Sequence, residues 1–316
     1  MKIIILAGGF ATRLWPLTEK TAKPLLKIGG TEIASFLVEN LPDAAEIVVS
    51  TNAVFAADFQ KWRKKFPEKK IEIFVEDAAG ETAKKGALAA VALVISQKKW
   101  RDDVFVFAGD NLFFFDFQKF FAAATKNPLL AAFDIKKKNA ARKFGVVIGK
   151  NGVVEKFEEK PENPKSSLVS TGALFFPKKF LPEIVAFSQK ENDNLGGIFE
   201  HFLRKKIRVE YFKFSEKWFD IGSFEVFLAA QKEILGQKCV DDGAEKIGKN
   251  EFSGAIFLGK KAKIENAFLE NVVVERGAKI KNATIRNSVI GENAVVENAD
   301  LSGVALRAES FVAAEN

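Results

Sequence analysis

Short apolar runs alternate with longer amphipathic stretches through the first three quarters of this 316-residue chain. The runs are rich in isoleucine, valine and phenylalanine, which is typical of buried strands. They cover residues 2–7, 46–51, 71–75, 104–108 and 129–134. The amphipathic stretches predict helices, and Asn52 is the predicted N-cap of one that passes through Trp62. This alternation predicts an α/β fold with a largely parallel sheet that is covered by helices.

The last quarter follows a different pattern, in which three blocks of sixteen residues align without a gap. The blocks are residues 259–274, 275–290 and 291–306. Each has alanine at its fourth and ninth positions, asparagine at its eighth, and an aliphatic residue at its sixth, eleventh and last. Apolar residues therefore recur at intervals of five, five and six, as expected for a three-sided coil with one inward residue on each side. The sequence predicts a stacked β-helix, with Ser310 and Val312 starting a fourth coil.

The two patterns predict two domains, one over residues 1–237 and a β-helix over residues 238–316, with its repeats from residue 259. Stacked coils bury their apolar side against one another, so an unfinished end coil needs a cap or a partner. We therefore expect a homo-oligomer that associates through the β-helix.

Composition narrows the setting in which the protein works. The net charge is +7, yet the lysines are scattered and lack the interleaved aromatic residues of a nucleic-acid groove. No apolar run approaches the ~20 residues that cross a bilayer, and the N-terminus lacks the pattern of a signal peptide. The single cysteine, Cys239, cannot form an internal disulfide. These features predict a cytoplasmic protein with no nucleic-acid or membrane partner.

The segment after the first predicted strand carries the strongest chemical pattern, Gly-Gly-Phe-Ala-Thr-Arg-Leu-Trp-Pro-Leu-Thr, followed shortly by Lys-Pro. Two glycines let the backbone approach a phosphate chain, whose oxygens can then be bound by N–H groups and cationic side chains. The pattern lacks the terminal Gly-Lys-Ser/Thr of a P-loop and the three spaced glycines of a dinucleotide fingerprint. It predicts a triphosphate-binding loop. Its candidate residues are Ala7, Gly8, Gly9 and Thr12 for nucleotide binding, with Arg13 and Lys23 in catalysis.

With this loop the sequence resembles the sugar nucleotidyltransferases, also called nucleotide-sugar pyrophosphorylases, over nearly the whole chain. Relatives usually carry a third glycine where Ala11 stands here. The resemblance implies a Rossmann-like mixed, mostly parallel sheet followed by a left-handed β-helix. It also implies a reaction in which a nucleoside triphosphate and a sugar 1-phosphate give a nucleotide sugar and pyrophosphate. The loop resembles mannose- and glucose-1-phosphate enzymes most.

Two further segments resemble the metal-binding motifs of this family. Phe-Ala-Gly-Asp-Asn places Asp110 at the end of an apolar strand, and Trp-Phe-Asp-Ile-Gly-Ser places Asp220 late in the catalytic domain. Carboxylate oxygens are the ligands that Mg²⁺ prefers, and two of them leave coordination positions open for phosphate oxygens. The resemblance therefore implies that Asp110 and Asp220 hold Mg²⁺ and act in catalysis.

The sugar-phosphate site is implied by a Glu-Lys-Pro motif. In the family's pattern Lys160 grips the phosphate of the sugar and Glu159 binds a sugar hydroxyl. Gly145, Thr171 and Gly172 fall where the family lines the sugar pocket, and glycine there allows close approach of the backbone.

The base-binding site is implied by residues that follow the strand over residues 71–75. Glu76 stands where relatives place a glutamine or glutamate near the base, and Gly86 ends the next glycine-containing motif. Ala83 replaces a glycine within that motif. The identity of the base is left open by these residues.

Three alternatives remain open at this point. Relatives with longer β-helices can transfer an acyl group there, generally with a histidine base, but the only histidine is His201, which the pattern places on an amphipathic helix in a packing or surface role. A catalytically inactive subunit that senses nucleotide sugars is a second alternative, although the set of charged candidates is intact. A nicotinamide-dependent dehydrogenase is a third, disfavoured by the missing fingerprint.

Overall fold

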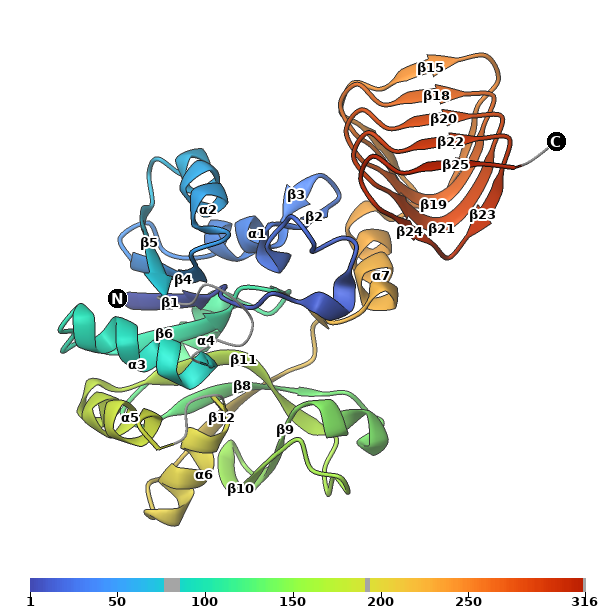
Figure 1. Cartoon of the computed structure of the whole chain (residues 1–316). Coiled ribbons are helices and arrows are strands. Elements are labelled where there is room, and N and C mark those ends of the chain that lie inside the picture. Colours follow the sequence, from blue (N-terminus) through green and yellow to red (C-terminus); the bar gives the residue numbers. More distant parts are fainter. Residues whose placement is uncertain (77–85, 191–193, 315–316) are drawn as a thin grey trace. The chain divides into compact units, whose positions relative to one another are not determined.

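The structure is a computed structural model, and it describes residues 1–76, 86–190 and 194–314. The chain forms two compact units (Figure 1). The first comprises Met1–Gly9 and Leu37–Asp220, and the second comprises Phe10–Phe36 and Ile221–Asn316. Helix α1 (Ile33–Glu39) lies where the chain passes from the second unit back to the first. The domain boundary after residue 237 stays a prediction.

A mixed nine-stranded sheet forms the centre of the first unit. Strands β5, β4, β1 and β6 pair in parallel, whereas β11 runs antiparallel to both β6 and β8. The mixed α/β fold is thereby confirmed, and the five strands expected from the sequence are found within one residue at each end. In spatial order the strands are β5 (Lys70–Glu76), β4 (Glu46–Asn52), β1 (Lys2–Leu6), β6 (Val104–Ala108), β11 (Leu168–Phe176), β8 (Leu129–Asp134), β12 (Glu210–Phe214), β10 (Val153–Glu159) and β9 (Gly145–Lys150).

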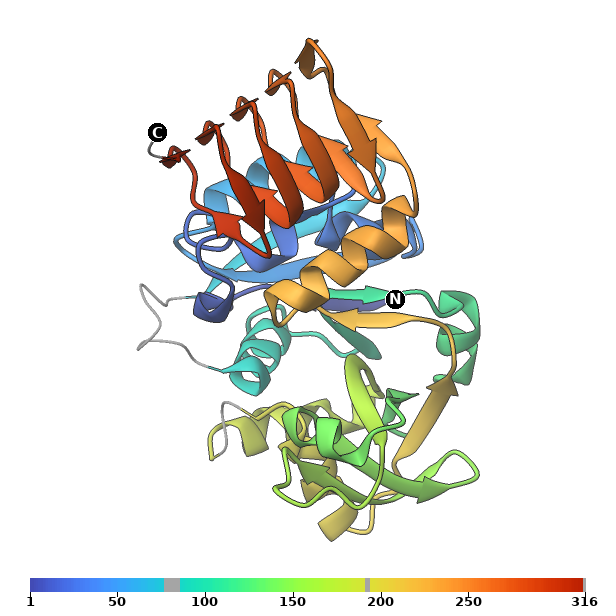
Figure 2. The ribbon, with the colours of Figure 1, turned by 90° about the vertical axis from the view of Figure 1, so that its right-hand side faces the viewer.

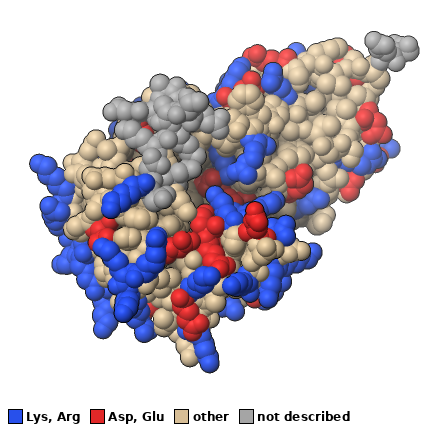
Figure 3. All heavy atoms as spheres, turned by 60° about the horizontal axis from the view of Figure 1, so that its bottom comes forward, with Lys and Arg blue, Asp and Glu red and all other residues tan. Residues whose placement is uncertain are grey.

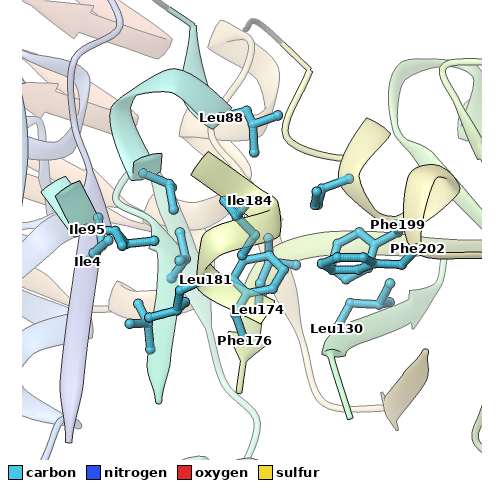
Figure 4. Packing of buried hydrophobic residues seen from close by; sticks show 14 of the residues in the cluster. Ile4, Leu88, Ile95, Leu130, Leu174, Phe176, Leu181, Ile184, Phe199 and Phe202 are labelled. Atoms are coloured by element: carbon cyan, nitrogen blue, oxygen red, sulfur yellow. The ribbon is translucent and has the colours of Figure 1, made fainter. Parts of the chain in front are cut away.

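Helices cover both faces of this sheet because successive strand residues point to opposite sides. Val104 and Val106 of β6 belong to a core that includes residues of α3 (Ala87–Gln97), α5 (Leu181–Ser188) and α6 (Gly197–Arg204) (Figure 4). Helix α5 contributes Leu181 and Ile184 to this core, and α6 contributes Phe199 and Phe202; in each helix the spacing keeps both side chains on one face. Helices α3, α5 and α6 therefore form a layer that packs on one face of the sheet.

The opposite face is closed by an aromatic cluster. Phe105 and Phe107 alternate with the valines of β6 and contact Phe120 of α4 (Phe117–Ala123), with ring centroids 5.9 and 6.1 Å apart. The side chain of Asp116 caps this helix by accepting a hydrogen bond from the Lys119 N–H. A further helix, α2 (Ala56–Trp62), buries Phe59 and Trp62.

The predicted N-cap at Asn52 is wrong. Asn52 ends β4, and α2 begins at Ala56 after Phe55. Both polar atoms of the Asn52 amide form hydrogen bonds. Its Oδ1 accepts from the Phe55 N–H at 3.2 Å, and its Nδ2 donates to the Gly8 carbonyl at 3.0 Å. The side chain thus ties the end of β4 to the chain that leaves β1.

A parallel β-helix fills the C-terminal part of the second unit, as the sixteen-residue repeat predicts (Figure 2). Ile264, Ile280, Val296 and Val312 stand in register on successive coils. The fourth coil, expected from Ser310 and Val312, forms β25. The strands are β14 (Cys239–Asp241), β15 (Glu245–Ile247), β16 (Glu251–Ser253), β17 (Ile256–Leu258), β18 (Lys263–Glu265), β19 (Phe268–Val274), β20 (Lys279–Lys281), β21 (Thr284–Ile290), β22 (Val295–Glu297), β23 (Asp300–Ser302), β24 (Ala305–Leu306) and β25 (Phe311–Ala313).

An additional coil precedes the repeats that the sequence shows. Cys239 pairs with Ile256 and Glu245 with Lys263, which are offsets of about seventeen and eighteen residues rather than sixteen. These extra residues hide the coil from a gap-free alignment, so the repeat begins earlier than residue 259.

The asparagine at position eight of each block has a structural reason. Asn266, Asn282 and Asn298 turn one corner of the β-helix with φ between 48° and 52°, a left-handed conformation that asparagine adopts more readily than most residues. Their amides form a column, in which Asn282 Nδ2 donates to Asn298 Oδ1 at 3.2 Å. In the additional coil, Gly248 stands beside Asn266, where an added Cβ would lie 2.1 Å from the Asn266 Oδ1.

The segment Phe10–Phe36 packs within the second unit against α7 (Phe224–Leu235) and the β-helix. Gln231 of α7 is buried and holds the hairpin of β2 (Lys27–Ile28) and β3 (Thr31–Glu32), because its Oε1 accepts from the Gly29 N–H and its Nε2 donates to the Lys27 carbonyl. An ion pair joins Arg307 of the β-helix to Glu19 at 2.9 Å.

On the face in Figure 3, lysine and arginine side chains lie among carboxylates and uncharged residues. Exposed pairs of this kind contribute at most about 1 kcal/mol each to stability.

Candidate functional site

Four of the predicted nucleotide-binding residues, Ala7, Gly8, Gly9 and Glu76, lie at or just after the carboxyl ends of β1 and β5. Ala7 is buried and donates its N–H to the Ser50 carbonyl at 2.8 Å. Glu76 is 5% exposed, and its Oε1 accepts from the Ser50 hydroxyl at 2.9 Å. A Cβ on Gly8 would lie 2.8 Å from that same oxygen, whereas a Cβ on Gly9 would meet nothing within 4 Å. A side chain at position 8 would therefore displace the buried Glu76 carboxylate.

The rest of the predicted triphosphate loop lies in the second unit. Ala11 has φ 49° and ψ 41°, so alanine occupies a left-handed turn that favours glycine. Its carbonyl accepts from the Thr18 hydroxyl at 2.8 Å. The exposed Thr12 and Arg13 follow in a 3₁₀ turn.

Two more predicted residues stand where a 3₁₀ turn and a helix begin. Lys23 opens a second 3₁₀ turn, Lys23–Leu25, in the second unit. Gly86 is the N-cap of α3 in the first unit with φ 80°, a conformation that favours glycine. Ala83 lies outside the described residues.

A cavity of about 290 Å³ in the first unit brings the other candidates together. Strand β7 (Asn111–Phe113) pairs antiparallel with β13 (Trp218–Asp220), and Asp220 stands opposite Asn111. This pairing brings Asp220 and Asp110 to one cavity although about 110 residues separate them in sequence. The predicted residues that line it are Asp110, Gly145, Glu159, Lys160, Thr171, Gly172 and Asp220. It is not lined by Ala7, Gly8, Gly9, Thr12, Arg13, Lys23, Glu76 or Gly86.

Glu159 is held between two glycines. A Cβ on Gly145 would lie 3.0 Å from its Oε2, and one on Gly196 would lie 2.2 Å from it. Burial raises the pKa of the Glu159 carboxyl above its ordinary value, and Lys160, 3.6 Å away, offsets this in part. The Glu159 N–H donates to Glu200 Oε1 at 3.1 Å. The carboxylate is therefore closely confined at the cavity wall.

Lys160 follows at the end of β10 with φ 45°, and its N–H donates to the Phe144 carbonyl at 3.0 Å. Its ammonium group is largely exposed, which suits a residue that binds an incoming phosphate. A turned backbone and an exposed cation are compatible with the role implied by the resemblance.

Thr171 and Gly172 lie at an irregularity in β11, where the pairing with β8 shifts register. The Thr171 hydroxyl donates to the Ala131 carbonyl at 3.1 Å, so its donor is already used within the fold. Gly172 has φ 80°, and a Cβ there would lie 2.9 Å from the Cβ of Ala108. A side chain at this position would therefore press on the end of β6, just before Asp110.

Among the lining residues that were not predicted from the sequence, four bear directly on the chemistry of the cavity: Asn111, Lys143, Gly196 and Trp218. Asn111 and Trp218 stand inside the motifs that carry Asp110 and Asp220, so their position could have indicated them. Lys143 precedes the Phe-Gly-Val-Val segment, which offers only proximity as a signal. Gly196 has no sequence signal, because its need for glycine comes from side chains packed against it in space.

The donor set is compatible with a divalent cation that also binds substrate. Among residues 1–76, 86–190 and 194–314, no group of three or more histidine, cysteine or carboxylate side chains could enclose a metal ion. Asp110 and Asp220 offer two carboxylates at one cavity, which leaves coordination positions for phosphate oxygens. A hard cation shared with phosphates fits this pair.

His201 has a packing role outside the cavity. Its ring stacks on Phe187 with centroids 4.4 Å apart, and its Nε2 lies 2.6 Å from Glu183 Oε1.

No helix in the described part of the chain has the length and apolar character to span a membrane.

Comparison with known proteins identifies the family. The sequence model of the nucleotidyl transferase family matches residues 2–237, about three quarters of the chain. The chain belongs to this family. Among nucleotidyl transferases it is 29% identical over 256 residues to Bifunctional protein GlmU of Methanocaldococcus jannaschii, covering 79% of this chain and 58% of the relative. It is 24% identical over 253 residues to glucose-1-phosphate adenylyltransferase of Clostridium acetobutylicum, covering 73% of this chain and 66% of that relative.

A solved nucleotidyl-transferase structure has the same fold over most of the chain. It is a Bacillus anthracis protein assigned as a glucose-1-phosphate thymidylyltransferase, in complex with sucrose. It superposes with a TM-score of 0.64 at 26% identity and covers 74% of this chain and 94% of that one. The chain spans about three fifths of the length of the curated relatives it matches.

Proposed function

We propose that this nucleotidyl transferase joins a nucleoside triphosphate to a sugar 1-phosphate and releases pyrophosphate. The observation that carries the proposal is the single cavity lined by the Asp110 and Asp220 carboxylates, by Lys160, and by the confined carboxylate of Glu159. The names of the similar proteins support glucose 1-phosphate as the first sugar to test. The resemblance of the triphosphate loop adds mannose 1-phosphate as the second.

The chemistry needs positioning more than acid–base catalysis. An oxygen of the sugar phosphate attacks the α-phosphorus in line, a new P–O bond forms there, and the bond from the α-phosphorus to the bridging oxygen breaks, so that pyrophosphate leaves with that oxygen. The nucleophile is already an anion, and no covalent enzyme intermediate is required. Bringing two polyanions together is the main barrier, which charge neutralisation and orientation lower.

Each residue has a part in this proposal. Arg13 and Lys23 bind the triphosphate, Lys160 binds the sugar phosphate, and Glu159 accepts a hydrogen bond from a sugar hydroxyl. Asp110 and Asp220 hold Mg²⁺, which when bound neutralises phosphate charge. Gly8 and Gly9 let the backbone approach the phosphates.

The remaining candidates complete the proposed pockets. Ala7, Thr12, Glu76 and Gly86 complete the nucleotide site, and Gly145, Thr171 and Gly172 shape the sugar pocket. We also propose that the protein works in the cytoplasm as a homo-oligomer that associates through the β-helix.

The test is pyrophosphate release with Mg²⁺, with each common nucleoside triphosphate paired with glucose, mannose, galactose and N-acetylglucosamine 1-phosphates. Asp110→Asn should lower the rate on the order of a hundredfold or more, because it removes a main electrostatic contribution. Asp58→Asn is the matched control, since Asp58 lies on α2 and does not line the cavity. Release that requires one sugar phosphate and falls in Asp110→Asn alone supports the proposal.

The alternatives predict other results. A sensing subunit would bind a nucleotide sugar without pyrophosphate release from any pair. An acyltransferase in the β-helix would acetylate an amino sugar phosphate from an acyl thioester, but residues 238–316 contain no histidine to act as the base.

A further inference from the structure

Three polar side chains at the cavity form a continuous hydrogen-bonded chain. The indole Nε1 of Trp218 donates to Asn111 Oδ1 at 2.7 Å, and Asn111 Nδ2 donates to Asp110 Oδ1 at 2.8 Å. All three side chains line the cavity. The chain ends on a carboxylate that the proposed function assigns to the divalent cation.

The direction of these hydrogen bonds follows from the chemistry of the donors. An indole N–H can only donate, so the Asn111 oxygen must face Trp218. The amide nitrogen of Asn111 must then face Asp110, and it can only donate to the carboxylate. One carboxylate oxygen is thereby fixed as the acceptor from the amide, which sets the rotation of the carboxylate and the direction of its other oxygen.

The surroundings hold this chain in one arrangement. Asn111 is 5% exposed. The Trp218 ring contacts Phe133 and Phe144, with centroids 5.8 and 5.4 Å away. The strands β7 and β13 that carry Asn111 and Trp218 also pair directly, and β13 ends at Asp220. Both carboxylates therefore depend on one two-stranded unit.

The same indole reaches the sugar side of the cavity. Phe144 precedes Gly145, and its carbonyl accepts from the Lys160 N–H at 3.0 Å. Trp218 thus contacts the residue that supports Lys160 while it orients the amide beside Asp110. A substitution of Trp218 should therefore affect both the Asp110 carboxylate and the segment that carries Lys160.

We propose that Asn111 and Trp218 are positioning residues that orient the Asp110 carboxylate toward the divalent cation. The inference rests on the proposed function only for the identity of that cation site. Residues that orient a metal ligand typically change metal affinity by 10- to 100-fold when they are removed. A purely structural role would change the melting temperature without changing the affinity for metal.

The experiment measures binding of Mn²⁺ to the purified full chain by electron paramagnetic resonance, without any nucleotide. Asp110→Asn defines the signal of the lost site. Trp218→Phe keeps the ring and removes the donor, and Asn111→Leu removes the amide. Trp62→Phe is the matched control, since this tryptophan is buried on α2 and does not line the cavity. Melting temperatures are recorded for all variants.

We expect about tenfold weaker Mn²⁺ binding in Trp218→Phe and Asn111→Leu, and unchanged binding in Trp62→Phe. Unchanged Mn²⁺ affinity in Trp218→Phe, with the site lost in Asp110→Asn, overturns the inference and leaves the proposed function standing. Wild-type binding in Asp110→Asn overturns it as well, because Asp110 is then no ligand. If the weakening occurs but no substrate pair releases pyrophosphate, the positioning role stands and the proposed reaction fails.

Discussion

Gly196→Ala tests the confinement of Glu159 with a single methyl group. Gly196 has φ −69° and ψ −29°, a helical conformation that alanine adopts without strain, so the effect of the substitution is steric. The new Cβ would lie 2.2 Å from Glu159 Oε2 and 2.8 Å from a ring carbon of Phe157. Ordinary contact begins at about 3.4 Å, so the carboxylate must retreat by roughly 1 Å. That shift is enough to lose a hydrogen bond to a sugar hydroxyl.

The size of the effect follows from the strength of that bond. A hydrogen bond to a charged group contributes about 1.5–3 kcal/mol, which corresponds to roughly 10- to 100-fold in the KM for the sugar phosphate. The KM for the triphosphate should stay within about twofold, because Glu159 is not assigned to that substrate. Initial rates of pyrophosphate release, with one substrate varied and the other saturating, separate the two constants.

Gly197→Ala is the control, at the next position along the chain. Its Cβ would meet Asn194 at 3.4 Å, an ordinary contact, so this variant should melt within a few degrees of wild type. Gly196→Ala should melt lower than the control, because its Cβ also displaces the buried Phe157 ring and overpacking of a core costs about 1–3 kcal/mol. A folded Gly196→Ala protein whose KM for the sugar phosphate equals that of Gly197→Ala would refute the assignment of Glu159 to the sugar.

Substitutions at three further positions test the fold. Ala11→Gly should raise stability by up to about 1 kcal/mol, because it relieves a left-handed alanine, and a lower melting temperature would contradict this. Asn282→Ala should cost about 1 kcal/mol more than Asn282→Gly in urea unfolding, because both lose the amide column but alanine is strained at φ 48° whereas glycine is not. Equal losses would refute the argument. The Ser167 hydroxyl and the Lys136 N–H lower the pKa of Asp134 to about 2. The ionised carboxylate therefore stabilises the fold above pH 3.8, and this stabilisation is lost as the pH falls toward 2. Asp134→Asn should melt at a lower temperature than wild type at pH 7 and at the same temperature as wild type at pH 2. An equal difference in melting temperature at both pH values would count against this cause.

The sequence predicted those parts of the fold that have a local period. Strand residues alternate or run apolar over a few positions, and each later coil repeats after sixteen residues, so both patterns are visible without tertiary information. The additional coil was missed because its offsets are longer and its corner has Gly248 where later coils have asparagine. The N-cap predicted at Asn52 failed because α2 begins only at Ala56. The contact of the Asn52 amide with Gly8, a residue distant in sequence, was equally invisible to a local pattern.

The candidate site divides in the same way. Asp110 and Asp220 stand in motifs with distinctive neighbours, so the sequence could indicate both as candidate metal ligands. Only the pairing of β7 with β13 shows that they share one cavity. Gly196 could not be found, because nothing near it in sequence distinguishes it from Gly197. The difference lies in Glu159 and Phe157, which reach it from another strand.

The packing of Phe10–Phe36 limits how modular the chain can be. An added Cβ on Gly30 would lie 2.7 Å from the Phe257 ring of the additional coil, and Glu19 pairs with Arg307 near the other end of the β-helix. A chimera that kept residues 1–237 and received a foreign solenoid would retain Arg13 and Lys23 but lose the surfaces that support their segment. An exchange of β-helices between relatives should therefore succeed only when the new β-helix keeps the contacts that Phe257 makes with Gly30 and Arg307 makes with Glu19.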